Sequence, residues 1–290
     1  MNPLWYDAIK RIRKNKMAVI AFYIILIYII IAILVAAGLI AQNFNSESGP
    51  PYAHPSLKHI LGTDIFGRDV FVRVIYGTKI SMSVGFIASL IAIPIGVILG
   101  AVAGFFGGFI DDIIVWFYST LASVPGLLLI LALSLVLKGK TILGISLSGL
   151  NSVYIAIGFT SWVGICRIIR AEVIKHKNRD YVLAARAFGA SHGRQIFTHI
   201  MPNVFHLIII DFSLRFISAI QSEVIISYLG LGAINIPSWG IMISDAKLEL
   251  SRGVWWQLFG ATFAMFLIVL ALNIFGDALR DALDPKLKNV

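Results

Sequence analysis

The chain has 290 residues, of which 58% are hydrophobic and only 13% are charged. Soluble domains are about 45 to 50% apolar and about 25% charged, so this composition excludes an ordinary soluble globular protein. The net charge of +9 indicates basic segments beside membrane spans rather than a nucleic-acid site. The single cysteine, Cys166, excludes an intramolecular disulfide and a cysteine-based metal site.

Six long apolar runs follow one another, each exceeding the roughly 20 residues with which a helix crosses a bilayer. They are residues 17–41, 81–110, 113–137, 141–166, 204–229 and 254–276. The first run has a basic flank, but it is longer than the apolar region of a signal peptide, about 7 to 15 residues, and predicts a retained anchor. The sequence therefore predicts an all-α membrane protein with six transmembrane helices.

Lysine and arginine are concentrated in alternate connecting segments, and the richer set includes both ends of the chain. The positive-inside rule then places the N- and C-termini in the cytoplasm. The predicted organisation is a cytoplasmic N-terminal segment 1–16, a first transmembrane helix 17–41, an extracytoplasmic loop 42–80, a five-helix core domain 81–276 with a cytoplasmic segment 167–203, and a cytoplasmic C-terminal tail 277–290.

The loop 42–80 contains two turn-forming clusters in which aspartate and arginine can pair. Their residues are Gly62, Thr63, Asp64, Gly67, Arg68 and Asp69. We interpret them as motifs that hold the loop in shape, and a structural role is favoured over a catalytic one.

Four glycines recur at four-residue spacing in the second apolar run, at Gly96, Gly100, Gly104 and Gly108. This spacing removes the side chains from one face of a helix and lets another backbone approach closely. The pattern predicts a packing face within a helical bundle.

The segment 167–203 is the longest of the predicted cytoplasmic segments and the most basic. At its centre, the residues from Tyr181 onward are strong helix formers, and Gly189 follows them. The pattern predicts a short helix that ends at a glycine cap.

Three ionisable residues lie inside the fifth apolar run. Asp211 and Arg215 are four residues apart and can neutralise each other on one helix face. Glu223 has no obvious local partner. Charged groups at such positions suggest a function, so we interpret the three as lining a translocation path or contacting another subunit, and a structural hydrogen-bonding role for Glu223 is an equal alternative.

Two further patterns imitate sites. Gly139-Lys140-Thr141 resembles the end of a phosphate-binding loop, but that loop requires a glycine where Ser134 stands, so no nucleotide site is predicted. The histidines are dispersed without ligand spacing, and no metal site is predicted. No cluster of nucleophile, base and orienting group is evident, so the chain is expected not to be an enzyme.

In the cytoplasmic segment, Ala184 and Ala185 are followed after three residues by Gly189, and then by residues 199–202, which end in Pro202. This motif resembles the "EAA" signature of ABC-importer permeases. Leu183 stands where the signature has glutamate. The resemblance implies that residues 167–203 are a coupling segment that contacts a partner ATPase through Ala184, Ala185, Arg186, Ala187 and Gly189.

Three further stretches are similar to the dipeptide/oligopeptide/nickel group of permeases, and to its "C" type of subunit. They are residues 61–77, residues 228–240 and residues 273–285. Asp111 is present after Gly107 and Gly108, but the further charges expected in the third apolar run are replaced by Trp116 and by Ser119 and Thr120.

This resemblance implies the six-helix MetI-like fold of type I ABC importers and a role in importing short peptides. The expected partners are a second homologous permease in a heterodimer, two ABC ATPases that bind ATP and Mg²⁺, an extracytoplasmic substrate-binding protein and the lipid bilayer. This chain is expected to bind no cofactor, and its location would be the cytoplasmic membrane of a bacterium or archaeon.

Two alternatives stay open. One is a permease of the same group for nickel or another small solute. The other is an ion-gradient-driven secondary transporter, although such transporters usually carry an inverted repeat that this sequence does not display.

Overall fold

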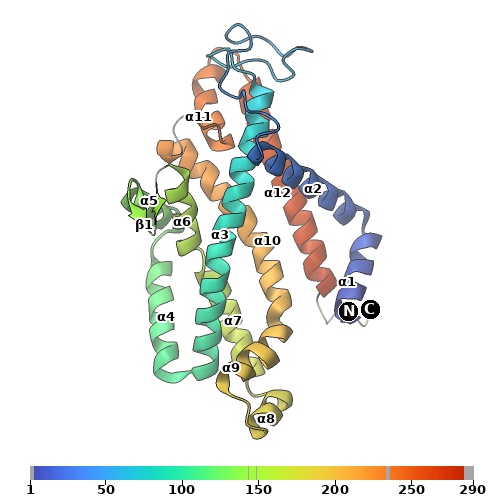
Figure 1. Ribbon diagram of the computed structural model, residues 1–290, viewed down its shortest axis with the longest axis vertical. Helices are drawn as coiled ribbons and strands as arrows, with labels where there is room; N and C mark the ends of the chain where they lie inside the picture. Colours follow the sequence, from blue (N-terminus) through green and yellow to red (C-terminus); the bar gives the residue numbers. More distant parts are fainter. Residues whose placement is uncertain (1–2, 143, 148, 233–235, 284–290) are drawn as a thin grey trace.

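The computed structural model describes residues 3–142, 144–147, 149–232 and 236–283, and most of them lie in helices (Figure 1). The α-helices are α1 (Pro3–Lys14), α2 (Lys16–Ala36), α3 (Val70–Phe106), α4 (Gly108–Ser123), α5 (Gly126–Leu137), α6 (Leu150–Thr160), α7 (Val163–His176), α8 (Asp180–Ala187), α9 (His192–Arg194), α10 (Met201–Ile226), α11 (Trp239–Leu250) and α12 (Trp256–Leu283). Two π-helical segments, η1 (Gln195–Ile200) and η2 (Ser227–Leu231), flank α10. Two short strands, β1 (Thr141–Ile142) and β2 (Ile145–Ser146), pair antiparallel.

Five helical stretches of the described residues are long and apolar enough to cross a membrane, and the bent pair α4 and α5 makes up to six. The five are residues 16–36, 70–106, 150–176, 192–231 and 256–283. The predicted all-α membrane fold is therefore confirmed, with the small β1–β2 hairpin as its one departure in the part of the chain that is described.

The third predicted span, residues 113–137, is not one straight helix. α4 and α5 are separated by a short break and form an angle of 94°. Val124 is extended, with φ −89° and ψ 133°, because proline disfavours the helical conformation of the residue before it. Pro125 also lacks the N–H that would continue the helical hydrogen bonds. The proline thus divides this apolar run into two helices.

The fourth predicted span, residues 141–166, begins later and ends later than expected. Gly139, Gly144 and Gly149 all have positive φ, and the chain between them turns back as the β1–β2 hairpin. Glycine adopts this conformation without the steric penalty of other residues. Helix formation therefore starts only at Leu150 and continues through α7 to His176.

Other predicted boundaries also shift. α2 ends at Ala36 instead of residue 41, and α3 begins at Val70, inside the predicted loop 42–80. Asp69 fixes that start, because its side chain accepts a hydrogen bond from the Val72 N–H at 3.1 Å. At the other end of the chain, residues 277–283 continue α12 rather than forming a tail, since Ala282 and Leu283 are buried against α1. Residues 284–290 lie outside the described part.

α3 is the central helix of the bundle, and the predicted glycine face packs against α7. A Cβ atom on Gly100 would lie 2.5 Å from the carbonyl oxygen of Cys166, and one on Gly104 would lie 2.6 Å from that of Arg170. Gly96 meets α7 in the same way. The prediction that Gly108 belongs to this packing face was wrong. Gly107 ends α3 with a φ of 70°, and Gly108 is the first residue of α4, where a Cβ atom would meet nothing within 4 Å.

The molecule is elongated (Figure 1). α8 lies at one end of the long axis, and the irregular residues 37–69 lie with α11 at the other. α1 packs beside the last turns of α12, in the same half of the molecule as α8. The two ends of the bundle therefore carry different candidate sites.

Candidate functional site

α8 projects from its end of the bundle (Figure 1). Most of its side chains are exposed. Of the predicted contact residues, Ala184, Arg186 and Ala187 are exposed, and Ala185 is half-buried. Phe188, which directly follows the helix, is 92% exposed. Exposed apolar and small side chains on a projecting helix form a surface suited to a protein partner.

The predicted glycine cap at the end of α8 is confirmed. Gly189 has a φ of 80°, its N–H donates to the carbonyl of Arg186, and the Ala190 N–H donates to the carbonyl of Ala185, both at 3.0 Å. These two bonds form a Schellman motif, which requires the left-handed conformation that glycine adopts most readily. The motif fixes the direction in which the chain leaves α8.

One buried side chain attaches α8 to the bundle. Val182 is 1% exposed and packs with Ile196, Ile200 and Val204 of η1 and α10. A second attachment is the hydroxyl of Tyr181, which lies 2.7 Å from Nδ1 of His176 at the end of α7. Packed contacts therefore join α8 to η1 and α10, and a hydrogen bond joins it to α7.

Pro202 is the last of the residues that the resemblance placed in the coupling segment. It lies in the first turn of α10 and is exposed. α10 follows directly on η1, and α8 packs against η1 through Val182. Pro202 is therefore connected to α8 through η1.

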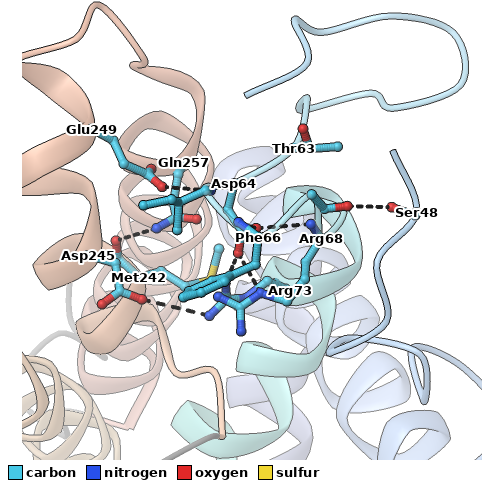
Figure 2. A network of polar contacts seen from close by, with 12 residues as sticks. Ser48, Thr63, Asp64, Phe66, Arg68, Arg73, Met242, Asp245, Glu249 and Gln257 are labelled. Atoms are coloured by element: carbon cyan, nitrogen blue, oxygen red, sulfur yellow. Dashed lines mark hydrogen bonds and ion pairs between the residues drawn. The ribbon is translucent and has the colours of Figure 1, made fainter. Parts of the chain in front are cut away.

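At the opposite end of the molecule, Asp64 is the centre of a buried polar network (Figure 2). Its carboxylate is 1% exposed and accepts hydrogen bonds from the N–H groups of Phe66 and Arg68, both at 2.9 Å. It also pairs with the guanidinium of Arg68 at 2.7 Å and with that of Arg73. The predicted aspartate–arginine pairing is confirmed for Asp64 and Arg68.

The network continues into α11, which sequence reasoning did not include. Nη2 of Arg73 lies 3.8 Å from Oδ2 of Asp245, and the Ile65 N–H donates to Oε1 of Glu249 at 3.3 Å. Burial raises the pKa of the carboxyl groups of both Asp245 and Glu249 above their ordinary values. These contacts join the start of α3 to α11 over a long separation in sequence.

The remaining motif residues shape the loop around Asp64. The Thr63 hydroxyl donates to the carbonyl of Pro50 and accepts from the Ala53 N–H, both at 2.7 Å. Asp69, besides capping α3, lies 2.9 Å from Nδ1 of His59. Gly62 has a φ of 64°, and a Cβ atom there would meet the Ala53 carbonyl oxygen at 2.5 Å.

Gly67, the other motif glycine, also has a positive φ, of 67°. Its carbonyl accepts hydrogen bonds from the N–H groups of Ser48 and Gly49, at 2.9 and 3.2 Å. The loop therefore depends on glycine at two turns and on hydrogen bonds between its halves.

Within the spans, the predicted pairing of Asp211 with Arg215 is confirmed. The guanidinium makes two bonds to the carboxylate, one of them from Nη2 to Oδ1 at 3.2 Å. An open pocket of about 300 Å³ is lined by Ser161, Asp211, Leu214, Arg215 and Ser218. The two charges thus lie at a hollow in the helical surface.

Glu223 agrees with the structural hydrogen-bonding alternative, although its partner lies within the chain. Its side chain is fully buried. It also has a local partner, because the Ser227 hydroxyl donates to Oε1 at 2.6 Å. The spacing of four residues between Glu223 and Ser227 on one helix was the signal that sequence reasoning missed.

The sequence patterns that resemble a phosphate-binding loop and a metal site form neither kind of site among the described residues. Gly139 and Lys140 lie in the turn before β1, and Gly139 donates its N–H to the carbonyl of Leu147 at 3.1 Å. Among the described residues there is no group of three histidine, cysteine, aspartate or glutamate side chains that could hold a metal ion.

The helices that are long and apolar enough to cross a membrane define a multi-pass membrane protein. Comparison with known proteins gives the particular family. The family described as "Binding-protein-dependent transport system inner membrane component" matches residues 92–289. The "N-terminal TM domain of oligopeptide transport permease C" matches residues 3–55.

Similar proteins cover nearly the whole chain. The dipeptide transport system permease protein DppC of Bacillus subtilis (strain 168) is 40% identical over 97% of this chain and 86% of its own length. The oligopeptide transport system permease protein OppC of the same organism is 38% identical over 98% of this chain and 90% of its own length. The glutathione transport system permease protein GsiD of Escherichia coli O6:K15:H31 is 37% identical over 74% of this chain and 68% of its own length. The chain belongs to the family of inner membrane components of binding-protein-dependent transport systems.

Proposed function

We propose that this chain is the transmembrane permease subunit of an ABC importer that moves short peptides across the cytoplasmic membrane. The observation that carries the proposal is the similarity, over 97% and 98% of the chain, to a dipeptide and an oligopeptide permease. The glutathione permease among its relatives supports a small peptide as substrate.

The projecting helix α8 is the proposed contact with an ATPase subunit. Its exposed small residues, Ala184 and Ala187, allow a close approach to a partner groove, and the cap at Gly189 sets the helix at a fixed angle. Two such ATPases would bind and hydrolyse ATP with Mg²⁺. This chain would bind no cofactor and no nucleic acid.

The remaining partners follow from the same proposal. A second, homologous permease would complete the translocation path as a heterodimer, and a substrate-binding protein would deliver peptides from outside. The excess of basic residues supports an orientation with α8 and both termini on the cytoplasmic side and the Asp64 network on the outer side.

The packing of α8 supports a rigid mechanical coupling. Closure of the ATPases would move α8, and Val182 would pass that movement to α10 through Ile196 and Ile200. At the far end, the ion pairs of Asp64 and Arg73 tie α3 to α11. The bundle would therefore rotate as a unit and open the path to the other side of the membrane.

Co-purification followed by an ATPase assay in liposomes tests the proposal. The assembly is incubated with its binding protein and with a panel of dipeptides, longer peptides and nickel. We expect an ATPase subunit to co-purify and its activity to rise with peptides. Purification of the chain alone, with transport driven by an ion gradient, would contradict the ATP-coupled function. Stimulation by nickel and not by peptides would contradict the substrate.

A further inference from the structure

α10 carries a line of polar side chains on one face. Asp211, Arg215, Ser218 and Ser222 follow each other at intervals of four, three and four residues. This spacing places side chains along one side of an α-helix. Leu214, at the edge of the same face, is 50% exposed, and Ser218 is exposed. Asp211 is buried and Arg215 and Ser222 are half-buried, so the face opens to the surface around Leu214 and Ser218.

A second element completes a hollow at this face. Ser161, in the turn between α6 and α7, contributes to the pocket that Asp211, Arg215 and Ser218 line. Gly164 leaves room for the guanidinium, since a Cβ atom there would lie 2.9 Å from Nη2 of Arg215. The pocket is thus formed by four polar residues and Leu214, from two segments of the chain.

The position of this face in the bundle opposes lipid contact. Arg215 lies near the middle of the predicted span 204–229, and Asp211 lies one helical turn before it. Charged groups within a membrane span are costly to expose to lipid, and they almost always face a bundle interior or a water-filled cavity. Because the two charges pair with each other, the face is polar but carries no net charge.

We propose that Asp211, Arg215, Ser218 and Ser222, together with Ser161, line the aqueous path through which a zwitterionic peptide crosses the membrane. The inference rests on the proposed function and adds the site of passage. A paired carboxylate and guanidinium offer one partner to an amino group and one to a carboxylate, and the hydroxyls offer partners to peptide groups. With no net charge, the path retains neither end of the peptide strongly.

The single, buried cysteine makes a cysteine-accessibility experiment direct. Cys166→Ala provides the background, and Ser218→Cys and Ser222→Cys are made in it. Ile27→Cys is the matched control, because Ile27 lies near the middle of α2 and is 54% exposed on an apolar helix. The assembled transporter in proteoliposomes is treated with a positively charged, membrane-impermeant thiol reagent, and modification is followed by mass spectrometry.

We expect the thiols of Ser218→Cys and Ser222→Cys to react at least about 10-fold faster than that of Ile27→Cys, since a charged reagent reaches only thiols in contact with water. Modification of Ser218→Cys should also abolish peptide uptake. Reaction no faster than the control would overturn the inference and indicate a face packed against lipid or another subunit. Fast reaction without loss of uptake would equally overturn it.

The two proposals fail in different ways. Thiol reaction is measured by mass and needs no substrate, so it reports the aqueous face even if peptides are not carried. Absence of peptide uptake by the unmodified assembly would contradict the proposed substrate, whereas unreactive thiols in an assembly that imports peptides would contradict only the path.

Discussion

The carboxylate of Asp64 accepts two backbone hydrogen bonds and pairs with two guanidinium groups while almost fully buried. Removing one partner of a buried ion pair leaves an uncompensated charge and typically costs about 3 to 5 kcal/mol. We therefore expect Asp64→Ala to lower the free energy of unfolding by about that amount, measured as a reduced thermal midpoint in detergent.

The control for this substitution is Glu172→Ala. Glu172 pairs with Lys175 at 3.1 Å on the surface of α7, and such exposed pairs contribute about 0 to 1 kcal/mol. Equal effects of the two substitutions would show that the Asp64 network does not stabilise the fold.

Glu223 gives a second prediction at the scale of the residue. The Ser227 hydroxyl donates to Oε1 of Glu223 inside the chain, and glutamine at this position keeps a side-chain oxygen as acceptor whereas alanine leaves the hydroxyl without one. Glu223→Ala should therefore reduce uptake in vesicles more than Glu223→Gln. Equal uptake by both variants would exclude a role for this hydrogen bond.

The contact between α3 and α7 depends on the absence of side chains on α3. A Cβ atom on Gly100 would approach a backbone carbonyl, which cannot rotate away. Overpacking of this kind costs about 1 to 3 kcal/mol, so Gly100→Ala should lower the thermal midpoint of the protein in detergent. Gly126→Ala is the matched control, because a Cβ atom there meets nothing within 4 Å, and its midpoint should not fall.

The end of α8 depends on a backbone conformation. Gly189 has open space around it, so alanine meets no clash, but a φ of 80° costs a residue with a Cβ atom about 1 to 2 kcal/mol. Gly189→Ala should loosen the cap, increase amide hydrogen exchange in α8 and reduce the amount of ATPase that co-purifies.

Gly193→Ala is the control that distinguishes loss of the α8 cap from the mere replacement of a glycine in this segment. Gly193 lies in α9, also in open space but without a positive φ. Unchanged exchange in α8 after Gly189→Ala would show that the Schellman motif does not hold the helix.

At the scale of the whole molecule, α8 and the loop of residues 37–69 lie at opposite ends (Figure 1). The distribution of basic residues predicts that the α8 end is cytoplasmic. In the Cys166→Ala background, an impermeant thiol reagent should label Leu57→Cys in intact cells, and should label Asn178→Cys only after permeabilisation. Both positions are exposed. The reverse pattern would invert the proposed topology.

Features that depend on near neighbours along one helix were predictable from the sequence. The glycine face of Gly96, Gly100 and Gly104, the cap at Gly189 and the pairing of Asp211 with Arg215 all follow from a helical repeat or a local turn. The apolar runs likewise predicted six spans from their length, and the structure has five helices of that kind among its described residues, or six if α4 and α5 are one bent span.

Features that join distant parts of the chain were decided by the tertiary structure. The link from Arg73 to Asp245 and the bond from Ile65 to Glu249 join residues far apart in sequence. Likewise, the burial of Glu223 results from the packing of α10 within the bundle. Hydropathy records only how apolar a segment is, whereas burial and long-range ion pairs depend on which helix faces pack together. The sequence alone therefore determined a membrane-spanning bundle with a capped projecting helix, and only the fold determined which polar groups it encloses and which it leaves open.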